Sequence, residues 1–405
     1  MQKVIIIGGG PAGMMAALQA ARAKNQVEII EKNKRPGKKL LITGKGRCNL
    51  SNYSDTAEHI RNIIDNPEFM YSSLAEFNPY QLYYFFENLD LKLKIERGDR
   101  VFPVSNRSAD VLKIMERELL KNKVSLIQDE VVKILSSDSK IEGVQLKYGG
   151  FKAADKIILA AGGKSYPQTG SDGNGFLLAA QLGHQIIKPE PGLTGLLTAE
   201  DWIYQAAGLK LKNVELKLLR NTEVIYSGFG ELEIRDGYLD GPLIITASMF
   251  IDHNPAEYEL VLDLKPALDY NTLDQRLLRD FAKYSNKYFA NSLADLLPSK
   301  LIPVIISRSK INYQKTVNQI TAAEREDLLK LFKKLTLKLK EKKGFKRAII
   351  TRGGVSTAEI NPQTMESSLI SGLYFAGEII DVAALTGGFN LQIAFATGFK
   401  AGNNL

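Results

Sequence analysis

The chain has 405 residues, of which 44% are hydrophobic and 24% charged, as in ordinary globular proteins with two domains or one large domain carrying insertions. Its 53 Lys and Arg against 45 Asp and Glu give a net charge of +8, a mild excess that permits an anionic partner such as RNA but is also typical of an evenly solvated surface. A single cysteine, Cys48, excludes an intrachain disulfide. With no signal peptide or membrane span in the pattern, we expect a cytoplasmic protein.

The first predicted element is an apolar strand over residues 4–7, typical of the centre of a parallel sheet. It runs into a turn in which Gly8, Gly10 and Gly13 have the spacing of a dinucleotide-binding fingerprint. Gly8 permits the tight turn, Gly10 leaves room for a pyrophosphate, and Gly13 lets the next helix pack close to the strand. The chain therefore begins with a predicted dinucleotide site.

The helix after this turn begins with Pro11 and Ala12, and its positive N-terminal end is expected to face the phosphates. A second strand then ends at Glu31, whose carboxylate is expected to accept hydrogen bonds from ribose hydroxyls. The neighbouring Lys32 adds positive charge beside the same ligand.

Residues 37–52 read GKKLLITGKGRCNLSN, which predicts a loop whose amide groups face a ligand. A solvated basic turn is the alternative. The candidate ligand contacts in this loop are Lys39, Gly44, Arg47, Cys48 and Asn49.

The middle of the cofactor part alternates helices and strands. We predict helix over most of residues 59–88, a helix ending near 121 that Asn106 or Ser108 caps, and strands near 124–127, 131–135 and 144–148. Val131 is expected to contact an adenine through its backbone. A strand over residues 156–160 leads into a turn expected to pass close to the cofactor, formed by Ala161, Gly162 and Gly163. Tyr166 follows as a candidate for the substrate pocket.

From about residue 189 the pattern changes to alternating strands, and residues 271–332 read as helical. Residues 338–347 form a basic, hairpin-like run, which either contacts RNA phosphates or is a solvated turn.

A second glycine cluster lies near the end of the chain. Gly377, Glu378 and Asp381 follow a predicted strand over 373–376, where an acid commonly bonds a ribityl hydroxyl. A last helix opens with further candidates, Gly388, Phe389 and Asn390, and its positive end would favour a reduced, anionic flavin ring. Arg352, beside two glycines, is a second candidate for the substrate pocket. Two clusters at opposite ends of the chain indicate FAD held between them.

These elements predict an α/β fold, a Rossmann-like flavoprotein of the two-dinucleotide-binding-domain type with an inserted β-rich and helical domain. We predict the FAD-binding domain over residues 1–188 and 344–405, and the insertion over 189–343.

Four motifs resemble those of the YhiN/BaiN-like (aminoacetone oxidase-family) bacterial FAD-binding oxidoreductases. They are GGGPAG, GKKLLITGKGRCNLSN, AAGGKSYPQTGSDGNG, and TRGGVSTAEI followed by GLYFAGEIIDV and TGGFNLQ. The resemblance covers essentially the whole chain. It implies non-covalent FAD, NAD(P)H as electron donor, and reduction of either a uridine C5=C6 bond in 23S ribosomal RNA or a steroid-like enone. Lys45 stands where the family pattern has a glycine, and Ala383 and Ala384 replace a common acid or glycine.

Two classes of function follow. The first is an RNA-modifying flavoenzyme that forms dihydrouridine in ribosomal RNA or its precursor, and the second is a small-molecule enone reductase or amine oxidase. The Cys48 thiol is a candidate proton donor for such a reduction, and a small buried side chain packed under the cofactor is the alternative. The three histidines are scattered without ligand spacing, so no metal site is predicted. The oligomeric state stays open.

Overall fold

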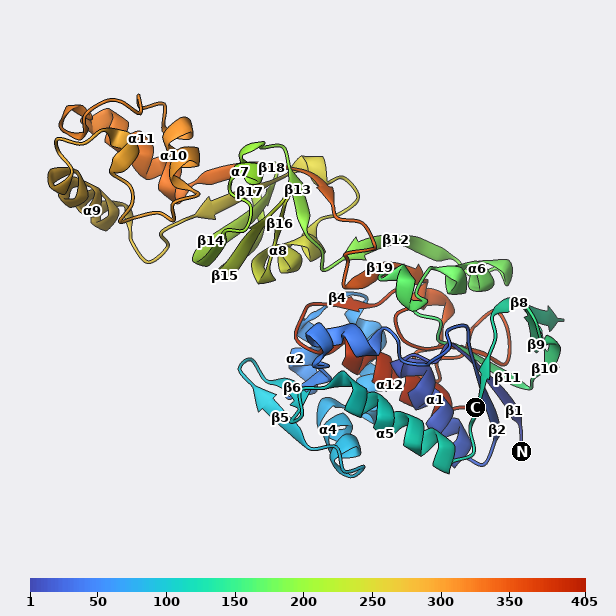
Figure 1. Cartoon of the computed structure of the whole chain (residues 1–405). Coiled ribbons are helices and arrows are strands. Elements are labelled where there is room, and N and C mark those ends of the chain that lie inside the picture. Colours follow the sequence, from blue (N-terminus) through green and yellow to red (C-terminus); the bar gives the residue numbers. More distant parts are fainter. The chain divides into compact units, whose positions relative to one another are not determined.

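The computed structural model describes all 405 residues and divides them into two compact units (Figure 1). Unit 1 comprises Met1–Gly192 and Phe345–Leu405, and unit 2 comprises Leu193–Gly344. The sequence places these boundaries after residues 188 and 343. The chain leaves unit 1 once and returns once, so unit 2 is an insertion.

Unit 1 is built on a five-stranded parallel sheet with the order β20-β11-β1-β2-β7. The strands are β1 (Lys3–Ile7), β2 (Gln26–Glu31), β7 (Ser125–Gln128), β11 (Lys156–Leu159) and β20 (Leu373–Phe375). The central β1 is apolar and buried from its second residue, as expected for a strand covered on both faces. Because β20 comes from the end of the chain, both terminal segments contribute to one sheet. The predicted α/β Rossmann-like fold is confirmed.

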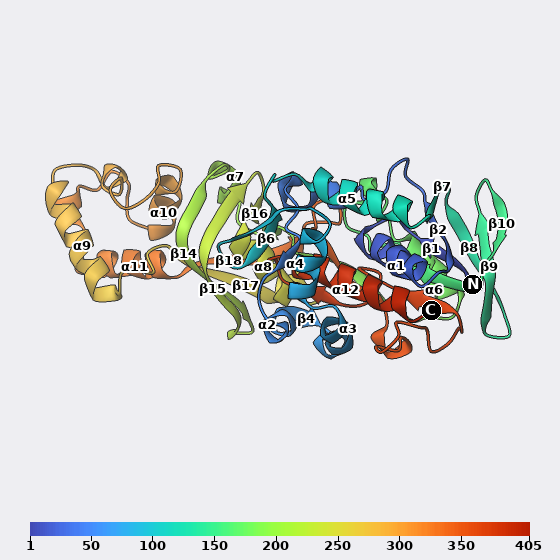
Figure 2. The ribbon, with the colours of Figure 1, turned by 90° about the horizontal axis from the view of Figure 1, so that it is seen from below.

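Two helices pack together across small residues. They are α1 (Pro11–Arg22) and α12 (Phe389–Asn403), which lie side by side in both views (Figures 1 and 2). A Cβ placed on Gly398 would lie 2.3 Å from the Ala12 carbonyl oxygen, and one on Gly402 would lie 2.4 Å from the Ala16 carbonyl oxygen. The two backbones therefore touch at glycine, which only a residue without a side chain allows.

Smaller elements complete unit 1. The helices are α2 (Thr56–Arg61), α3 (Tyr71–Glu76), α4 (Pro79–Glu87), α5 (Ser108–Lys121) and α6 (Asn174–Gln181). The strands outside the parallel sheet are β3 (Ser51–Asn52), β4 (Ile63–Asp65), β5 (Leu93–Glu96), β6 (Arg100–Pro103), β8 (Val131–Ser137), β9 (Lys140–Leu146), β10 (Gly150–Ala153), β12 (Ile186–Gly192), β19 (Ile350–Val355) and β21 (Ala383–Ala384).

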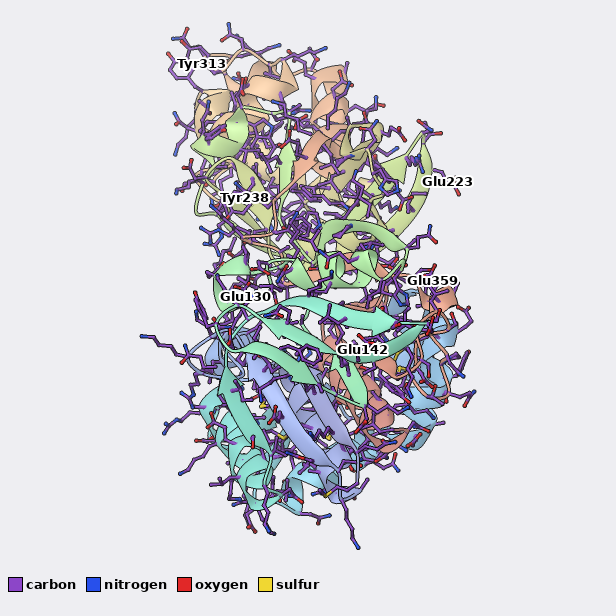
Figure 3. All side chains as sticks on the ribbon, turned by 90° about the vertical axis from the view of Figure 1, so that its right-hand side faces the viewer. Glu130, Glu142, Glu223, Tyr238, Tyr313 and Glu359 are labelled. Atoms are coloured by element: carbon purple, nitrogen blue, oxygen red, sulfur yellow. The ribbon has the colours of Figure 1, made fainter.

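The prediction of helix over most of residues 59–88 is confirmed by α2, α3 and α4, between which β4 pairs with β21 from the far end of the chain. Two other local predictions for unit 1 were wrong. Neither Asn106 nor Ser108 caps α5: Asn106 accepts hydrogen bonds from Arg47, and the Ser108 hydroxyl donates to the Leu41 carbonyl. The meander β8–β9–β10 has one more strand than predicted. Figure 3 shows Glu130 beside this meander and Glu142 on it.

Unit 2 combines a closed barrel with a group of helices. The barrel order is β13-β16-β15-β14-β17-β18, and every pairing is antiparallel. Its strands are β13 (Leu196–Thr198), β14 (Lys210–Arg220), β15 (Glu223–Arg235), β16 (Tyr238–Asp240), β17 (Tyr258–Asp263) and β18 (Leu335–Lys342). The helices are α7 (Trp202–Gln205), α8 (Pro242–Ala247), α9 (Tyr270–Lys283), α10 (Ile302–Ser309) and α11 (Ala322–Lys333).

The basic run over 338–347 is not a hairpin. Its first half is the end of β18, which closes the barrel against β13, and its second half leads the chain back to unit 1. The predicted β-rich and helical insertion is present. None of the helices combines the length and the apolar character that a membrane span requires.

We predict that Gly398→Ala lowers the free energy of unfolding by about 1–3 kcal/mol, because the new methyl group forces α12 away from the α1 backbone. Urea or thermal denaturation measures the change. Gly344→Ala is the matched control, since its added Cβ meets nothing within 4 Å and its φ is not left-handed. Equal stability of the two variants would contradict this account of the helix contact.

Candidate functional site

The first glycine turn has a distinct role for each glycine. Gly8 has a φ of 105° and comes so close to Ala160 that a Cβ would lie 2.5 Å from that residue's carbonyl oxygen. Gly13 packs against the turn itself, where a Cβ would lie 2.0 Å from the Gly8 carbonyl oxygen. A Cβ on Gly10 would meet no atom within 4 Å. The protein therefore needs Gly8 and Gly13 for packing and leaves the side of Gly10 open.

Helix α1 begins directly at this open side. Gly10 is its N-cap residue, Pro11 is its first residue, and it has neither a capping side chain nor an acid in its first turn. The positive end of the helix is thus left for an anion from outside the helix. Ala12, in the same turn, lies against Gly377, whose added Cβ would come within 2.7 Å of the Ala12 Cβ. The first and second glycine clusters meet here.

Glu31 lies where β2 ends and is tied to the same turn. Its Oε2 accepts a hydrogen bond from the Gly9 amide at 2.8 Å, and its Oε1 accepts from the amide and side chain of Asn33. Lys32 forms an ion pair with Asp172 at 2.8 Å. Val131, the first residue of β8, is buried and comes two residues after Asp129, whose amide donates to the Glu31 carbonyl at 3.2 Å.

The loop after Lys39 is dominated by left-handed backbone. Gly44, Lys45, Gly46 and Cys48 all have positive φ, between 57° and 85°. Lys45 therefore adopts, at φ 59° and ψ 40°, the conformation for which the family pattern has a glycine. Such a run of left-handed residues persists only where the surrounding structure holds it.

Three side chains of this loop have different surroundings. Cys48 is fully buried, and burial raises the pKa of its thiol to about 12, so that the sulfur keeps its proton at neutral pH. The Oδ1 atom of Asn49 is buried and has no hydrogen-bond partner within the protein. Arg47 lies over the Phe102 ring at 4.2 Å and pairs with Glu96 and Asn106. The structure thus leaves an open acceptor on Asn49 and commits Arg47 to the β5–β6 hairpin.

Glu378 is the centre of a polar cluster. Its Oε2 lies 2.5 Å from Lys39 Nζ, and its Oε1 accepts hydrogen bonds from the Ser165 hydroxyl at 3.0 Å and the Thr351 amide at 2.8 Å. The turn with Ala161 and Gly162 enters the cluster at Gly163, where a Cβ would lie 2.4 Å from the Thr351 hydroxyl oxygen. Four segments that are distant in the sequence are joined here.

A second cluster surrounds Asp381. Asn66 donates from its side-chain amide to the Asp381 carbonyl at 2.6 Å and to its carboxylate at 3.0 Å. Burial raises the pKa of Asp381, against the hydrogen bond from Asn66. Arg352 forms two hydrogen bonds with Asp65, at 2.8 and 2.7 Å. Of the two predicted substrate-pocket residues, Arg352 is therefore held by Asp65, and Tyr166 is half-buried at a left-handed position with φ 53°.

Helix α12 begins in the same unit at Gly388, which has a φ of 105° and would place a Cβ 2.2 Å from the Ser51 carbonyl oxygen. No side chain caps this helix either. Phe389 is buried against the ring of His59. The Asn390 side chain bonds both the amide and the carbonyl of Ala384, so it holds the β21 segment. Only the backbone at this helix start remains for a ligand.

Sequence reasoning missed four polar residues that support these clusters. They are the hydrogen-bonding partners Asp65, Asn66, Ser165 and Thr351. Ser165 and Thr351 stand inside quoted motifs, but nothing in the motif shows that they meet around Glu378. Asp65 and Asn66 lie in a region that was predicted to be helical, and no signal in the sequence distinguishes them.

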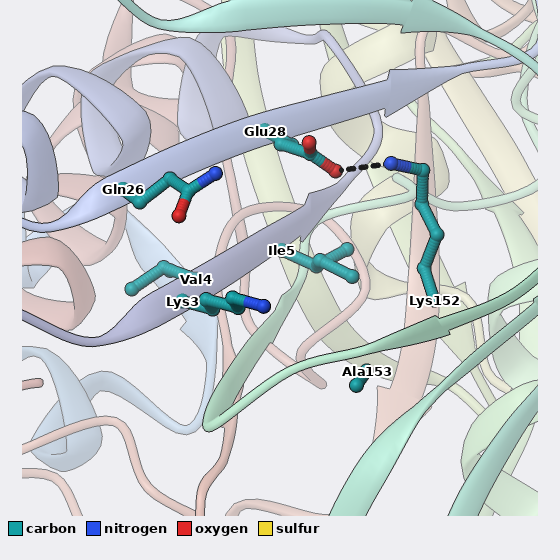
Figure 4. Close-up of a pocket in the computed structure, with 7 residues that line it drawn as sticks. All are labelled: Lys3, Val4, Ile5, Gln26, Glu28, Lys152 and Ala153. Carbon is teal, nitrogen blue, oxygen red and sulfur yellow. Dashed lines mark hydrogen bonds and ion pairs between the residues drawn. The ribbon is translucent and has the colours of Figure 1, made fainter.

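A shallow cavity of about 220 Å³ lies elsewhere in unit 1. It is lined by Lys3, Val4, Ile5, Gln26, Glu28, Lys152 and Ala153 (Figure 4). These residues include the first residues of β1 and β2, whereas the glycine turn follows the last residue of β1. Ligands of open parallel sheets bind beyond the carboxyl ends of the strands, so this cavity is not the candidate site.

Three comparisons relate this chain to known proteins. Residues 2–404 match the family described as HI0933-like protein Rossmann domain. A 3-dehydro-bile acid delta(4,6)-reductase from Clostridium scindens is 33% identical, over 99% of this chain and 98% of the relative. A ribosomal RNA dihydrouridine synthase from Escherichia coli is 25% identical, over 99% of this chain and 97% of the relative.

Among solved structures, 3-ketosteroid-delta4-(5alpha)-dehydrogenase from Rhodococcus jostii RHA1 has a TM-score of 0.50 at 15% identity, and the alignment covers 100% of this chain and 96% of that one. This likeness shows the fold alone. The family match and the relative from Clostridium scindens confirm the resemblance drawn from the sequence motifs. The chain therefore belongs to the HI0933-like Rossmann family and is an oxidoreductase of that family.

Proposed function

We propose that this protein is an FAD-dependent reductase that saturates a carbon–carbon double bond conjugated to a carbonyl group. The observation that carries the proposal is the contact between the two glycine clusters, where Gly377 lies against Ala12 beside the uncapped start of α1. The same unit holds the uncapped start of α12 at Gly388 and the acids Glu31 and Glu378. Two positive helix ends and two acids at strand ends match a ligand that has both phosphates and sugar hydroxyls.

The residues fit FAD. Open space beside Gly10 and the uncapped start of α1 suit a pyrophosphate, and Glu31 suits the adenosine ribose. The unpartnered Oδ1 of Asn49 suits a ring N–H donor. We assign the same ligand to the other predicted contacts, namely Gly8, Pro11, Ala12, Gly13, Lys32, Lys39, Gly44, Arg47, Cys48, Val131, Ala161, Gly162, Gly163, Gly377, Glu378, Asp381, Gly388, Phe389 and Asn390.

Bound FAD would supply the hydride, which we propose it receives from NAD(P)H. The residues of the chain then have three tasks: to bind the cofactor, to orient the substrate carbonyl and to deliver a proton. Lys39 pairs with the predicted contact Glu378, and Arg352 pairs with Asp65, so each of these two cations is held in place by an acid. Fixed cations of this kind stabilise the negative charge that develops on a carbonyl oxygen when hydride adds to the conjugated carbon.

Two substrates have this chemistry. The names of the Escherichia coli and Haemophilus influenzae relatives, at 25% and 26% identity, support a uridine of ribosomal RNA, whose C5=C6 bond is conjugated to the C4 carbonyl. The name of the Clostridium scindens relative, at 33% identity, supports a steroid-like enone. We propose that the uridine is the substrate and that the protein acts in the cytoplasm. The enone is the second candidate substrate. None of the three relatives' names describes an amine oxidation.

One experiment separates the candidates. The purified protein is reduced anaerobically with NADH or NADPH, and the loss of flavin absorbance is followed in a stopped-flow instrument. The reduced protein is then mixed with unmodified 23S ribosomal RNA or with 4-androstene-3,17-dione. We expect reoxidation by the RNA, with dihydrouridine detected by mass spectrometry. Reoxidation by the enone alone would assign the second function, and a colourless protein that takes up no FAD would end the proposal.

We predict that Gly10→Val leaves the fold intact and lowers FAD affinity at least about tenfold, because the new side chain fills space that no protein atom occupies. The backbone of Gly10 has a φ of −78°, which any residue can adopt. Circular dichroism checks the fold, and titration with FAD measures the affinity. Gly13→Ala is the contrasting variant, expected to destabilise the protein itself, since its Cβ clashes with the backbone of Gly8. Unchanged FAD affinity in Gly10→Val would contradict the assignment.

We propose Cys48 as the proton donor. The prediction is that Cys48→Ala retains FAD and its reduction by NAD(P)H but loses product formation by about a hundredfold or more. With a thiol pKa raised to about 12, the protonated form persists from pH 6 to 9, so Cys48 should add no basic limb to the rate profile in that range. Stopped-flow reduction and product assays measure the two half-reactions. Unchanged turnover would leave Cys48 as a buried packing residue.

A further inference from the structure

One group of basic residues in unit 1 lies beside the left-handed loop. The β5–β6 hairpin has exposed cations in its turn, Arg97 and Arg100, and Arg107 follows it at the start of α5. The Arg100 guanidinium donates to the Arg97 carbonyl at 3.0 Å, which holds the turn. None of these three guanidinium groups has a carboxylate partner, whereas Arg47 and Lys94 share Glu96. Three unpaired cations are therefore displayed on one hairpin and its continuation.

A cluster of tyrosines adjoins this hairpin. The Tyr53 ring lies edge-on to the rings of Tyr80 and Tyr83, at 4.9 and 5.0 Å, and Tyr84 packs against Tyr83. Tyr80 and Tyr84 remain 37% and 55% exposed. Exposed tyrosines beside unpaired arginines are the combination with which proteins hold single-stranded nucleic acid, because rings stack on bases while cations neutralise phosphates.

Hydrogen bonds join the two groups into one surface. The Tyr53 amide donates to the Asp99 carbonyl at 2.6 Å, and the Asn52 side chain donates to the Gly98 carbonyl at 2.9 Å. Asn52 also donates to the Gly387 carbonyl, at 3.3 Å, in the second glycine cluster. The hairpin turn and the tyrosines are therefore positioned relative to each other by backbone contacts, next to the proposed cofactor site and in the same unit.

We propose that Arg97, Arg100, Arg107, Tyr80 and Tyr84 form an RNA-binding surface that holds unpaired nucleotides next to the target base. The arginines take phosphates and the tyrosines stack on bases. This inference rests on the uridine form of the proposed function, since a steroid-like substrate needs no such surface.

The test is RNA binding without turnover. Fluorescence anisotropy measures the affinity of the FAD-loaded protein for a labelled single-stranded RNA of about 16 nucleotides, at several salt concentrations. We expect R97Q/R100Q/R107Q to weaken binding about tenfold or more and to make the slope of log K against log salt shallower by about 2, since three phosphate contacts are lost. Y80L/Y84L should weaken binding about tenfold with an unchanged slope, because stacking releases no counterions.

The matched control is K121Q/K133Q/K140Q, which removes the same charge from exposed lysines at the end of α5 and on the meander β8–β9–β10. Figure 1 places the C-terminal end of α5 and the meander at the other end of unit 1 from the β5–β6 hairpin. Equal loss of affinity in both triple variants would show that only net charge matters and would overturn the proposal. Unchanged affinity in both triple variants would overturn it as well.

This outcome is separable from the proposed function. Flavin absorbance and its bleaching by NAD(P)H are recorded for every variant, and neither should change, because no substituted residue belongs to the proposed cofactor site. A wild-type protein that binds RNA through this surface but forms no dihydrouridine would support the surface and contradict the uridine substrate. A wild-type protein that reduces the enone and binds no RNA would overturn the surface alone.

Discussion

The backbone contact between α1 and α12 is the constraint on which the rest of unit 1 depends. Gly398 and Gly402 let one helix lie directly on the carbonyl groups of Ala12 and Ala16 in the other. Close approach of this kind adds dispersion contacts along both helices and fixes how far one helix is shifted along the axis of the other. Because Gly398 faces Ala12 and Gly402 faces Ala16, the two helices run in the same direction, and both positive ends point the same way. The start of α12 lies roughly 12 Å beyond the start of α1, a separation that suits an extended ligand.

Buried ionic groups complete the arrangement begun by the helices. Glu378 with Lys39 and Asp65 with Arg352 are largely withdrawn from water, with side chains that are 16–21% exposed. Pairs of this kind contribute little net stability, but loss of one partner leaves a costly unpaired charge. Their role is therefore one of position: each pair joins segments that are hundreds of residues apart and holds a cation in a single orientation next to the proposed cofactor.

The left-handed loop over residues 44–48 differs from the buried ion pairs, because its backbone conformation is itself strained. Two of its residues, Lys45 and Cys48, hold a conformation that glycine adopts more cheaply. Strain of this kind is concentrated at functional sites, where a loop must present particular groups. Here it buries the Cys48 thiol, leaves an acceptor of Asn49 unpartnered, and directs Arg47 toward the hairpin whose other arginines are unpaired.

The sequence by itself determined the local features. The strand, turn and helix at the start of the chain, the acid at the end of β2 and the small residues of the last helix are encoded within a few positions of one another, because turn sterics and hydrophobic periodicity act locally. Only the tertiary structure decided the partners. It paired β4 with β21, bonded the Asn390 side chain to the β21 segment, joined Arg352 to Asp65, and gathered Ser165 and Thr351 around Glu378. Such pairings depend on which distant segments the sheet and the helix contact bring together, and the free energy of burying a polar group is set by those neighbours, not by the residues next to it in the chain.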